Sequence, residues 1–171
     1  MEIVRTTDIP PCHFRPTHLG RHLDQAIAFT HMGGYADITT KDDTPSQVHQ
    51  LLEEAVADHI TMSSDSNGSM PKWDSKRERI VGMGVGRMTN LYRAVRRMVT
   101  EEGIPLETAL PFITSNVARA LELYPRKGAV QVGSDADLVL LDQDLSICGV
   151  FAKGRPMMWE KELLAKGTFE E

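Results

Sequence analysis

Cysteine is scarce in this chain, which contains only Cys12 and Cys148 among its 171 residues. The two lie far apart in the sequence, and neither has a second cysteine close to it. This spacing argues against a disulfide-stapled fold and against a zinc site built on cysteine. Each cysteine is therefore interpreted as a free, buried thiol.

Long apolar runs and an excess of positive charge are also missing. No uninterrupted apolar segment approaches the ~18 residues that a membrane helix requires, and the chain does not start with a basic and then apolar leader. We therefore expect a cytoplasmic protein with no membrane partner. The 19 basic residues are outnumbered by 24 acidic ones, which gives a net charge of −5 and argues against nucleic acid as a partner. The one close group of arginines, Arg93, Arg96 and Arg97, is interpreted as the solvent-exposed face of a helix.

The composition, with 41% hydrophobic and 25% charged residues, is that of an ordinary globular protein. The first third of the chain alternates between short β-like segments, at residues 13–18, 35–40 and 60–65, and helical ones, at residues 22–32 and 44–56. Thr44 and Pro45 are expected to open the second helix, with the threonine hydroxyl as its cap.

Glycines and charges are frequent in residues 66–86, which are predicted to form a long loop of a length that is often functional in compact domains. A long amphipathic helix is expected at residues 88–102, and two shorter helical segments within 106–121, with a break near 111–115. After residue 128 the pattern changes to short strands separated by glycine-containing turns. These strands are expected at residues 130–133, 136–142, 147–153 and 157–164.

Strands that alternate with helices favour a parallel α/β sheet with right-handed crossovers. Three such units are visible, whereas a closed (β/α)8 barrel takes about 250 residues. The pattern leaves two alternatives open, a small open α/β sheet or the C-terminal part of something larger.

Two of the expected strands end in a side chain that can bind metal, His18 and Asp65. The carboxyl ends of parallel strands meet at one edge of a sheet, so both are candidates for a shared site. A catalytic zinc site needs at least three protein ligands, and this spacing supplies two, so a hydrogen-bonded histidine and a turn aspartate remain open alternatives. His22 would share a helix face with His18, but Pro16 and Gly20 disfavour an unbroken helix there.

Five short strings are more informative than these spacings. In chain order they are residues 16–21 (PTHLGR), 63–71 (SSDSNGSMP), 114–118 (TSNVA), 133–139 (GSDADLV) and 166–170 (KGTFE). Similar strings occur in this order in the β-aspartyl (isoaspartyl) dipeptidases of the amidohydrolase superfamily. The chain resembles the C-terminal part of such an enzyme along essentially its whole length.

The resemblance implies a zinc-dependent hydrolase of β-aspartyl dipeptides. It also implies an α/β fold, the C-terminal portion of a metal-dependent hydrolase (β/α)8 TIM barrel plus strands of a small β-sandwich domain. Residues 1–127 would form the last three β/α units and the closing helices of the barrel. Residues 128–171 would form β-strands of the small composite sandwich domain.

The resemblance assigns roles to four residues. His18 matches the metal-ligand histidine at the end of the sixth barrel strand, and Asp65 matches the aspartate at the end of the eighth, which binds metal and shuttles the proton. Arg21 and Ser69 match residues that hold the substrate, and arginine offers a planar, two-pronged donor for a carboxylate. In the family, a hydroxide that bridges two zinc ions attacks the amide carbonyl, and the aspartate passes the proton to the departing amine.

The remaining family ligands, a His-x-His pair, a bridging carboxylated lysine and another histidine, belong to an N-terminal half that this sequence does not contain. Leu19, Gly20, Ser66 and Met70 also differ from the commonest family residues at their places. We therefore expect the 171-residue chain by itself to bind zinc poorly and to have little or no activity. Two alternatives are a non-catalytic or complementing subunit, which joins a separate N-terminal chain or forms a homo-oligomer, and another amidohydrolase activity such as cyclic-amide hydrolysis.

Overall fold

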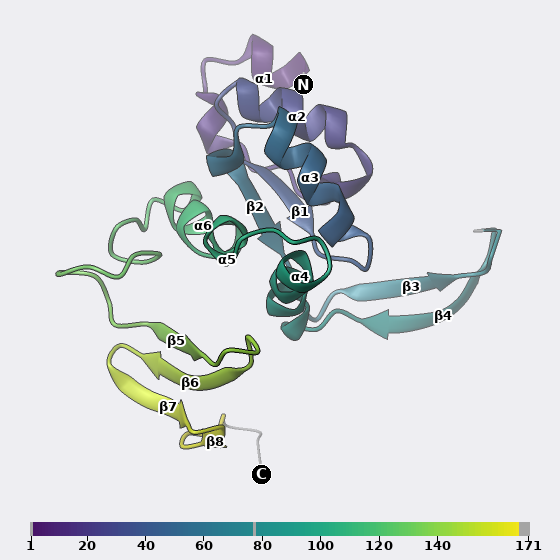
Figure 1. The fold of residues 1–171 in the computed structure, drawn as a ribbon. Helices are drawn as coiled ribbons and strands as arrows, with labels where there is room; N and C mark the ends of the chain where they lie inside the picture. Colours follow the sequence, from purple (N-terminus) through teal and green to yellow (C-terminus); the bar gives the residue numbers. More distant parts are fainter. Residues whose placement is uncertain (1, 77, 168–171) are drawn as a thin grey trace.

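The computed structural model of the protein describes residues 2–76 and 78–167, which form a mixed α/β structure with three separate small sheets (Figure 1). Its α-helices are α1 (Glu2–Thr6), α2 (Leu23–His31), α3 (Thr44–Glu54), α4 (Thr89–Thr100), α5 (Leu106–Ala109) and α6 (Ser115–Ala120). Short 3-10 helices are η1 (Pro11–His13), η2 (Leu19–Arg21), η3 (Ala57–His59) and η4 (Leu110–Ile113). The strands are β1 (Ala36–Thr39), β2 (Ile60–Ser63), β3 (Ser69–Trp73), β4 (Ile80–Val85), β5 (Leu138–Leu141), β6 (Ile147–Ala152), β7 (Arg155–Trp159) and β8 (Glu162–Leu163).

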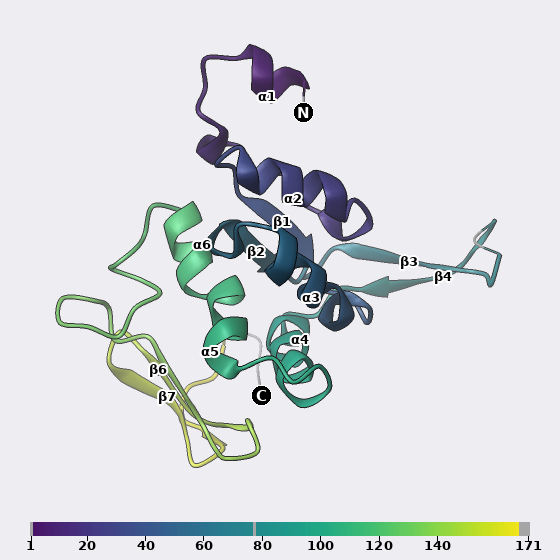
Figure 2. The same ribbon diagram turned by 45° about the horizontal axis from the view of Figure 1, so that its top comes forward.

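The sheet at the centre of the molecule pairs β1 and β2 in parallel, with residues 36–39 opposite residues 60–63. Its two faces differ because side chains alternate along a strand. Ile38, Ile60 and Met62 are buried in the core. The same core takes in the apolar sides of α2, α3 and α4, and Figures 1 and 2 show these helices around the paired strands. The opposite face carries Asp37 and hydroxyl side chains.

Helix α2 ends at the predicted pair of glycines. Gly33 has φ +87°, a left-handed conformation that glycine adopts without a side-chain clash. The N–H of Gly34 donates to the Phe29 carbonyl at 3.1 Å, and a Cβ at Gly34 would lie 2.3 Å from the buried Phe29 ring. A side chain at position 34 would therefore displace a core residue.

Helix α3 begins at Thr44, as predicted, and buries Val48 and Leu51. The expected cap is wrong, because the Thr44 hydroxyl does not bond to the first turn of the helix. It accepts a hydrogen bond from the Lys41 N–H at 2.8 Å, while Asp43 holds the N-cap position without a side-chain bond. The hydroxyl thus tightens the turn that leads from β1 into the helix.

Helix α4 buries Ala94, Val95 and Met98 on one side and leaves its arginines on the other. Arg97 is held in place there, since its guanidinium pairs with Glu101 at 2.9 Å and donates to the Asp42 carbonyl at 3.0 Å. The helical region that follows is broken at Thr114, inside the predicted range.

The first expected strand, at residues 13–18, is wrong. Residues 14–18 have no regular secondary structure and lie between η1 and η2. They run beside β1, where the Asp37 N–H donates to the Pro16 carbonyl at 3.0 Å. Proline has no N–H to return a bond to the neighbouring strand, so a ladder is disfavoured at this point.

The predicted long loop at residues 66–86 is also wrong, because most of it forms an antiparallel hairpin. Strand β3 pairs with β4 from Ser69 opposite Val85 to Trp73 opposite Ile80, and the charged residues Asp74, Lys76, Glu78 and Arg79 lie between the two strands. The alternation of Val81, Met83 and Val85 with glycines is the strand signal within this segment. Both ribbon views show the hairpin projecting away from the other elements (Figures 1 and 2).

The C-terminal part forms an antiparallel sheet in the order β5-β6-β7-β8. The expected strands at 136–142 and 147–153 agree with β5 and β6, whereas the expected strand at 157–164 is divided by a turn at residues 160–161 into β7 and β8. Residues 130–133 are not a strand. The sheet is tied to the helices by the Tyr92 hydroxyl, which donates to the Leu145 carbonyl at 2.6 Å. Burial of the Tyr92 ring raises the pKa of that hydroxyl above its usual value.

The two cysteines and the lengths of the helices can be compared with the sequence expectations. Cys12 and Cys148 are free, as predicted, but each is half-buried and not fully buried. Within residues 2–76 and 78–167, no helix has the length and apolar character needed to cross a bilayer.

An ion cluster fastens the start of the tail to the helical part. The Lys127 ammonium lies 2.8 Å from Asp135 and also pairs with Asp137, whose other oxygen accepts the Lys153 N–H at 2.7 Å. The hydrogen bonds from Lys127 lower the pKa of both carboxyls, and the same bonds raise the pKa of Lys127.

We expect Lys127→Met to destabilise the fold at neutral pH and to have no such effect in strong acid. A carboxyl whose pKa is lowered by folding stabilises the native state above its unfolded pKa, and this contribution is lost as the pH falls through the folded value. The contribution of Lys127, whose pKa is raised, is present below its unfolded pKa and is lost as the pH rises through the folded value. Urea unfolding followed by circular dichroism at several pH values measures the difference.

Lys166→Met is the matched control, since it removes the same charge from the same tail. It should leave the urea midpoint unchanged at every pH. A destabilisation by Lys127→Met that persists in strong acid would show that the lysine acts through packing of its alkyl chain and not through its two ion pairs.

Candidate functional site

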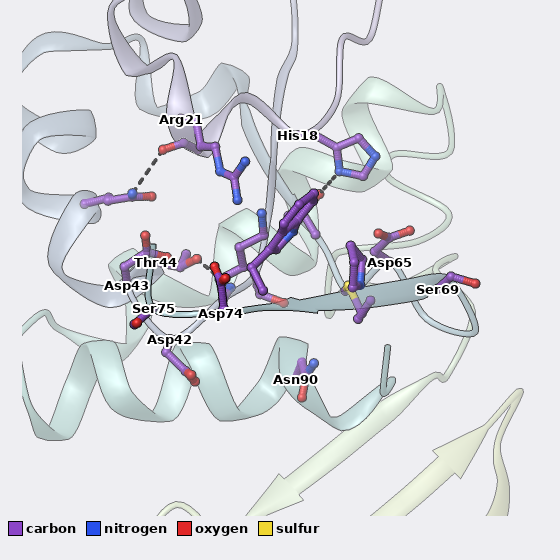
Figure 3. A pocket seen from close by; sticks show the side chains of 18 residues that line it. His18, Arg21, Asp42, Asp43, Thr44, Asp65, Ser69, Asp74, Ser75 and Asn90 are labelled. Carbon is purple, nitrogen blue, oxygen red and sulfur yellow. Dashed lines mark hydrogen bonds between the residues drawn. The ribbon is translucent and has the colours of Figure 1, made fainter. Parts of the chain in front are cut away.

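A cavity of about 850 Å³ lies at the carboxyl ends of β1 and β2 (Figure 3). Its walls come from the η2 segment, the turn from β1 into α3, the turn after β2, the hairpin at β3 and the start of α4. His18, Arg21, Asp65 and Ser69, the four residues assigned from the resemblance, all line this cavity. The other lining residues are Gly20, Thr39, Thr40, Lys41, Asp42, Asp43, Thr44, Gln47, Met70, Pro71, Trp73, Asp74, Ser75 and Asn90.

His18 reaches the cavity from the turn before η2. Its backbone is left-handed, with φ 62°, which is uncommon for a residue with a side chain and aims the imidazole across the end of β1. The ring is held there by a 2.6 Å hydrogen bond between its Nδ1 and the Thr39 hydroxyl. His22, the second histidine of the sequence pair, does not line the cavity.

Asp65 follows the end of β2 and is half-buried, also in a left-handed conformation, with φ 48°. Its carbonyl accepts the Gly68 N–H at 3.0 Å, which closes a tight turn. The N–H of Gly86, the residue after β4, donates to the Gly68 carbonyl at 3.0 Å. The hydrogen bond fastens the C-terminal end of β4 to this turn. The turn therefore holds the Asp65 carboxylate and the start of the hairpin in one place.

Arg21 and Ser69 approach the cavity from different elements, η2 and the start of β3. The η2 segment is anchored to α3, because the Gln47 side-chain amide donates to the Gly20 carbonyl at 3.0 Å. Within the described ranges, no carboxylate forms a salt bridge with Arg21. Its exposed guanidinium is thus available to an acidic ligand.

The lining has a mixed character that suits a small zwitterion. Arg21 and Lys41 supply positive charge, and four aspartates supply negative charge. The hairpin adds an apolar wall that includes Pro71 and Trp73, the latter 45% exposed. In Figure 3, His18 and Asp65 lie toward one end of the cavity, and Asp42 and Asp43 lie toward the other.

The described residues supply part of a metal site. Imidazole and carboxylate are suitable donors for zinc, and His18 and Asp65 line the same cavity. Within residues 2–76 and 78–167, however, no group of three or more histidine, cysteine, aspartate or glutamate side chains is close enough to hold an ion. The donor types fit a divalent metal, and their number falls short of the three that a catalytic zinc requires.

Sequence reasoning missed the hairpin wall and the polar face beneath the cavity. The wall could have been found from the alternation of apolar residues and glycines at positions 81–85. The polar face could have been found from residues 37 and 39 on one strand and 61 and 63 on the next, which have the spacing of one strand face.

Comparison with known proteins gives a consistent family. Residues 12–166 match the sequence profile of the amidohydrolase family. The L-hydantoinase of Paenarthrobacter aurescens is 32% identical over 139 residues, which cover 78% of this chain and 30% of that enzyme.

Solved structures add a similarity over nearly the whole chain. The β-aspartyl dipeptidase of Fervidobacterium islandicum AW-1, solved in complex with the β-Asp-Leu dipeptide, is 32% identical with a TM-score of 0.86. The match covers 98% of this chain and 46% of that enzyme, and a second structure of a β-aspartyl dipeptidase from this bacterium matches with a TM-score of 0.81 at 28% identity. The chain thus spans less than half the length of these relatives.

Proposed function

Because the chain belongs to the amidohydrolase family, we propose that it forms the C-terminal part of a metal-dependent hydrolase that cleaves β-aspartyl dipeptides. The observation that carries the proposal is the cavity that His18, Arg21, Asp65 and Ser69 all line, although they come from two distant segments, residues 18–21 and 65–69. The similarity to the Fervidobacterium dipeptidase, which covers 98% of this chain with a TM-score of 0.86, supports this substrate class.

Under this proposal, His18 and Asp65 contribute two ligands to a zinc site whose other ligands come from residues outside this sequence. Bound zinc would lower the pKa of a water and polarise the amide carbonyl. Asp65, at the rim of the same cavity, would hold the proton of that water and deliver it to the departing amine. The 171-residue chain by itself should therefore bind zinc weakly and turn over little or no dipeptide.

Arg21 and Ser69 would hold the substrate. A β-aspartyl dipeptide carries two carboxylates and one ammonium, and a guanidinium binds a carboxylate through two parallel hydrogen bonds. The hydroxyl of Ser69, at the start of β3, would supply one further donor. We place the apolar side chain of the leaving residue against the hairpin wall, where Trp73 offers exposed aromatic surface.

The same proposal accounts for the architecture. Residues 1–127 would complete a (β/α)8 barrel, in which β1 and β2 are two of the parallel strands. Residues 128–171 would add strands to a small β-sandwich. The polar face of β1 and β2 would then point into the barrel, and their apolar face already packs on helices.

A complementing subunit is a second candidate, favoured by exposed apolar surface. Val139 and Leu140 on β5 are 55% and 38% exposed, and Leu163 on β8 is 62% exposed. A cavity of about 610 Å³, lined largely by apolar side chains, also lies between the helical region 110–123 and the start of β5. Cyclic-amide hydrolysis is a third candidate, which rests on the 32% identity with the hydantoinase.

We expect the chain to bind β-Asp-Leu in the cavity even without turnover, because Arg21 and Ser69 both belong to it. The backbone amide resonances of His18, Arg21, Asp65 and Ser69 should shift when the dipeptide is titrated into the ¹⁵N-labelled chain. Arg21→Met should weaken the binding about tenfold or more, as expected for the loss of a charge-assisted hydrogen bond of about 1.5 to 3 kcal/mol.

Two controls separate a specific site from general charge attraction. Arg155→Met removes an exposed arginine that does not line the cavity and should leave the affinity unchanged. The isomer α-Asp-Leu has the same charges in a different arrangement and should bind more weakly. Equal shifts with both isomers, or shifts confined to other regions, would contradict the proposed substrate.

A further inference from the structure

A line of hydrogen bonds connects His18 to Asp37 across the polar face of β1 and β2. The Nδ1 of His18 lies 2.6 Å from the Thr39 hydroxyl, which lies 3.5 Å from the Ser63 hydroxyl. The Ser63 hydroxyl donates to the Asp37 carboxylate at 2.6 Å. The parallel register places residue 39 opposite residue 63, so the two strands themselves bring these groups together.

Asp37 determines in which direction the hydroxyls along this line donate their protons. Its carboxylate accepts from three hydroxyls, those of Thr17 at 2.7 Å, Thr61 at 3.0 Å and Ser63 at 2.6 Å. An ionised carboxylate accepts hydrogen bonds and donates none, and each hydroxyl has one proton to give. Ser63 therefore donates its one hydroxyl proton to Asp37, and toward any other partner the Ser63 oxygen can only accept.

The Thr39 hydroxyl lies between Ser63 and His18, and it also has only one proton to give. With the Ser63 oxygen free to accept, the arrangement that uses every hydroxyl proton is the one in which Thr39 donates to Ser63 at 3.5 Å and its own oxygen accepts from the imidazole at 2.6 Å. A neutral imidazole that donates from Nδ1 carries its lone pair on Nε2.

We infer that Asp37 is a positioning residue, which acts through Ser63 and Thr39 to hold the proton of His18 on Nδ1 and leave Nε2 as the lone-pair nitrogen. An imidazole that ligates a metal is commonly held through its other ring nitrogen by a carboxylate or backbone group. The value of this tautomer for metal binding rests on the proposed function, whereas the inference of the tautomer itself rests on the hydrogen bonds between Asp37 and His18.

The test is the tautomer of His18 in the intact, ¹⁵N-labelled chain without added metal. Two-bond ¹H–¹⁵N correlation spectra, recorded well above the usual histidine pKa of about 6.5, distinguish protonated from unprotonated ring nitrogens. His18→Gln identifies the resonances. The expected result is a protonated Nδ1.

Ser63→Ala is the decisive variant because it does not touch the histidine. Without Ser63 as acceptor, Thr39 turns its proton toward Nδ1, and the His18 proton should move to Nε2 in most molecules. Thr39→Val should have the same result, because Nδ1 then loses its acceptor. A merely structural role of Ser63 would leave the tautomer unchanged.

Thr61→Val is the matched control. It removes another hydroxyl that bonds to Asp37, on the same strand, but one that does not lead to His18. The tautomer should stay as in the unaltered chain. A protonated Nε2 in the unaltered chain, or an equal response to Ser63→Ala and Thr61→Val, would overturn the inference.

This experiment is independent of substrate and metal. If the dipeptide fails to bind while His18 shows the expected tautomer and the expected response to Ser63→Ala, the proposed function fails and the positioning role stands. If the dipeptide binds but the His18 proton is on Nε2, the positioning role of Asp37 fails and the proposed function stands.

Discussion

Gly86→Ala is expected to destabilise the protein by about 2 to 3 kcal/mol, in the range measured when atoms are forced into well-packed structure. A Cβ at position 86 would lie 2.1 Å from the carbonyl oxygen of Asp65, and backbone cannot move aside as a flexible side chain can. The turn at residues 65–68 would have to shift away from the hairpin. Urea unfolding measures the loss of stability, and amide chemical shifts of residues 65–70 report the displacement.

Gly82→Ala, four residues earlier and within β4, is the control for the general effect of replacing a glycine in this segment. The nearest atom to a Cβ there belongs to the Lys72 side chain, at 3.8 Å, so the methyl group meets no obstacle. Its effect should stay within about 0.5 kcal/mol. If the two variants were equally stable, the contact between position 86 and the Asp65 carbonyl would not hold the turn, and Asp65 would owe its position to other contacts.

Asn116→Asp is expected to cost about 3 to 5 kcal/mol at neutral pH, the range for an unpaired charge in the interior. Asn116 is 1% exposed, and its amide nitrogen donates to the carbonyls of Ala57 and Ile60, both at 2.9 Å. A carboxylate of nearly the same shape would face these two oxygens with no proton to offer. Thermal or urea unfolding at pH 7 gives the change in free energy.

A repeat at low pH tests the cause. A protonated carboxyl at position 116 could donate to one of the two carbonyls, so part of the lost stability should return. Asn90→Asp makes the same chemical change in the first turn of α4, where a negative charge interacts favourably with the helix dipole, and should not destabilise. A loss for Asn116→Asp that is the same at both pH values would indicate a packing effect and not the buried charge.

The Asn116 contacts also show why part of the fold was beyond sequence analysis. The helix that carries this residue was predicted from its local pattern, but the two carbonyls that it binds belong to η3 and β2, more than 50 residues away. Its other amide atom, Oδ1, has no partner among the described residues. Local periodicity does not encode such a tertiary contact.

The hairpin formed by β3 and β4 was missed for the opposite reason. Its local strand signal was present in the sequence, but the glycines and charges of the same segment outweighed it in the prediction. Glycines and charges indicate a loop, and they are also compatible with strands whose exposed edges carry no packed side chains. Pairing between residues 69–73 and 80–85 decided the outcome, and this long stretch became a wall of the cavity.

The sequence itself determined the longer helices α2, α3 and α4 and the strands β1, β2, β5 and β6, because capping residues, glycine stops and apolar periodicity act within a few neighbours. It did not predict α1 or the 3-10 helices, and residues 13–18, 66–86 and 130–133 differ from expectation. Its motifs also singled out His18, Arg21, Asp65 and Ser69. Only the tertiary structure decided that these four share a cavity and that a line of hydroxyls joins His18 to Asp37. The physical reason is that both depend on the register between β1 and β2 and on turns with left-handed backbone, which arise when distant segments pack together.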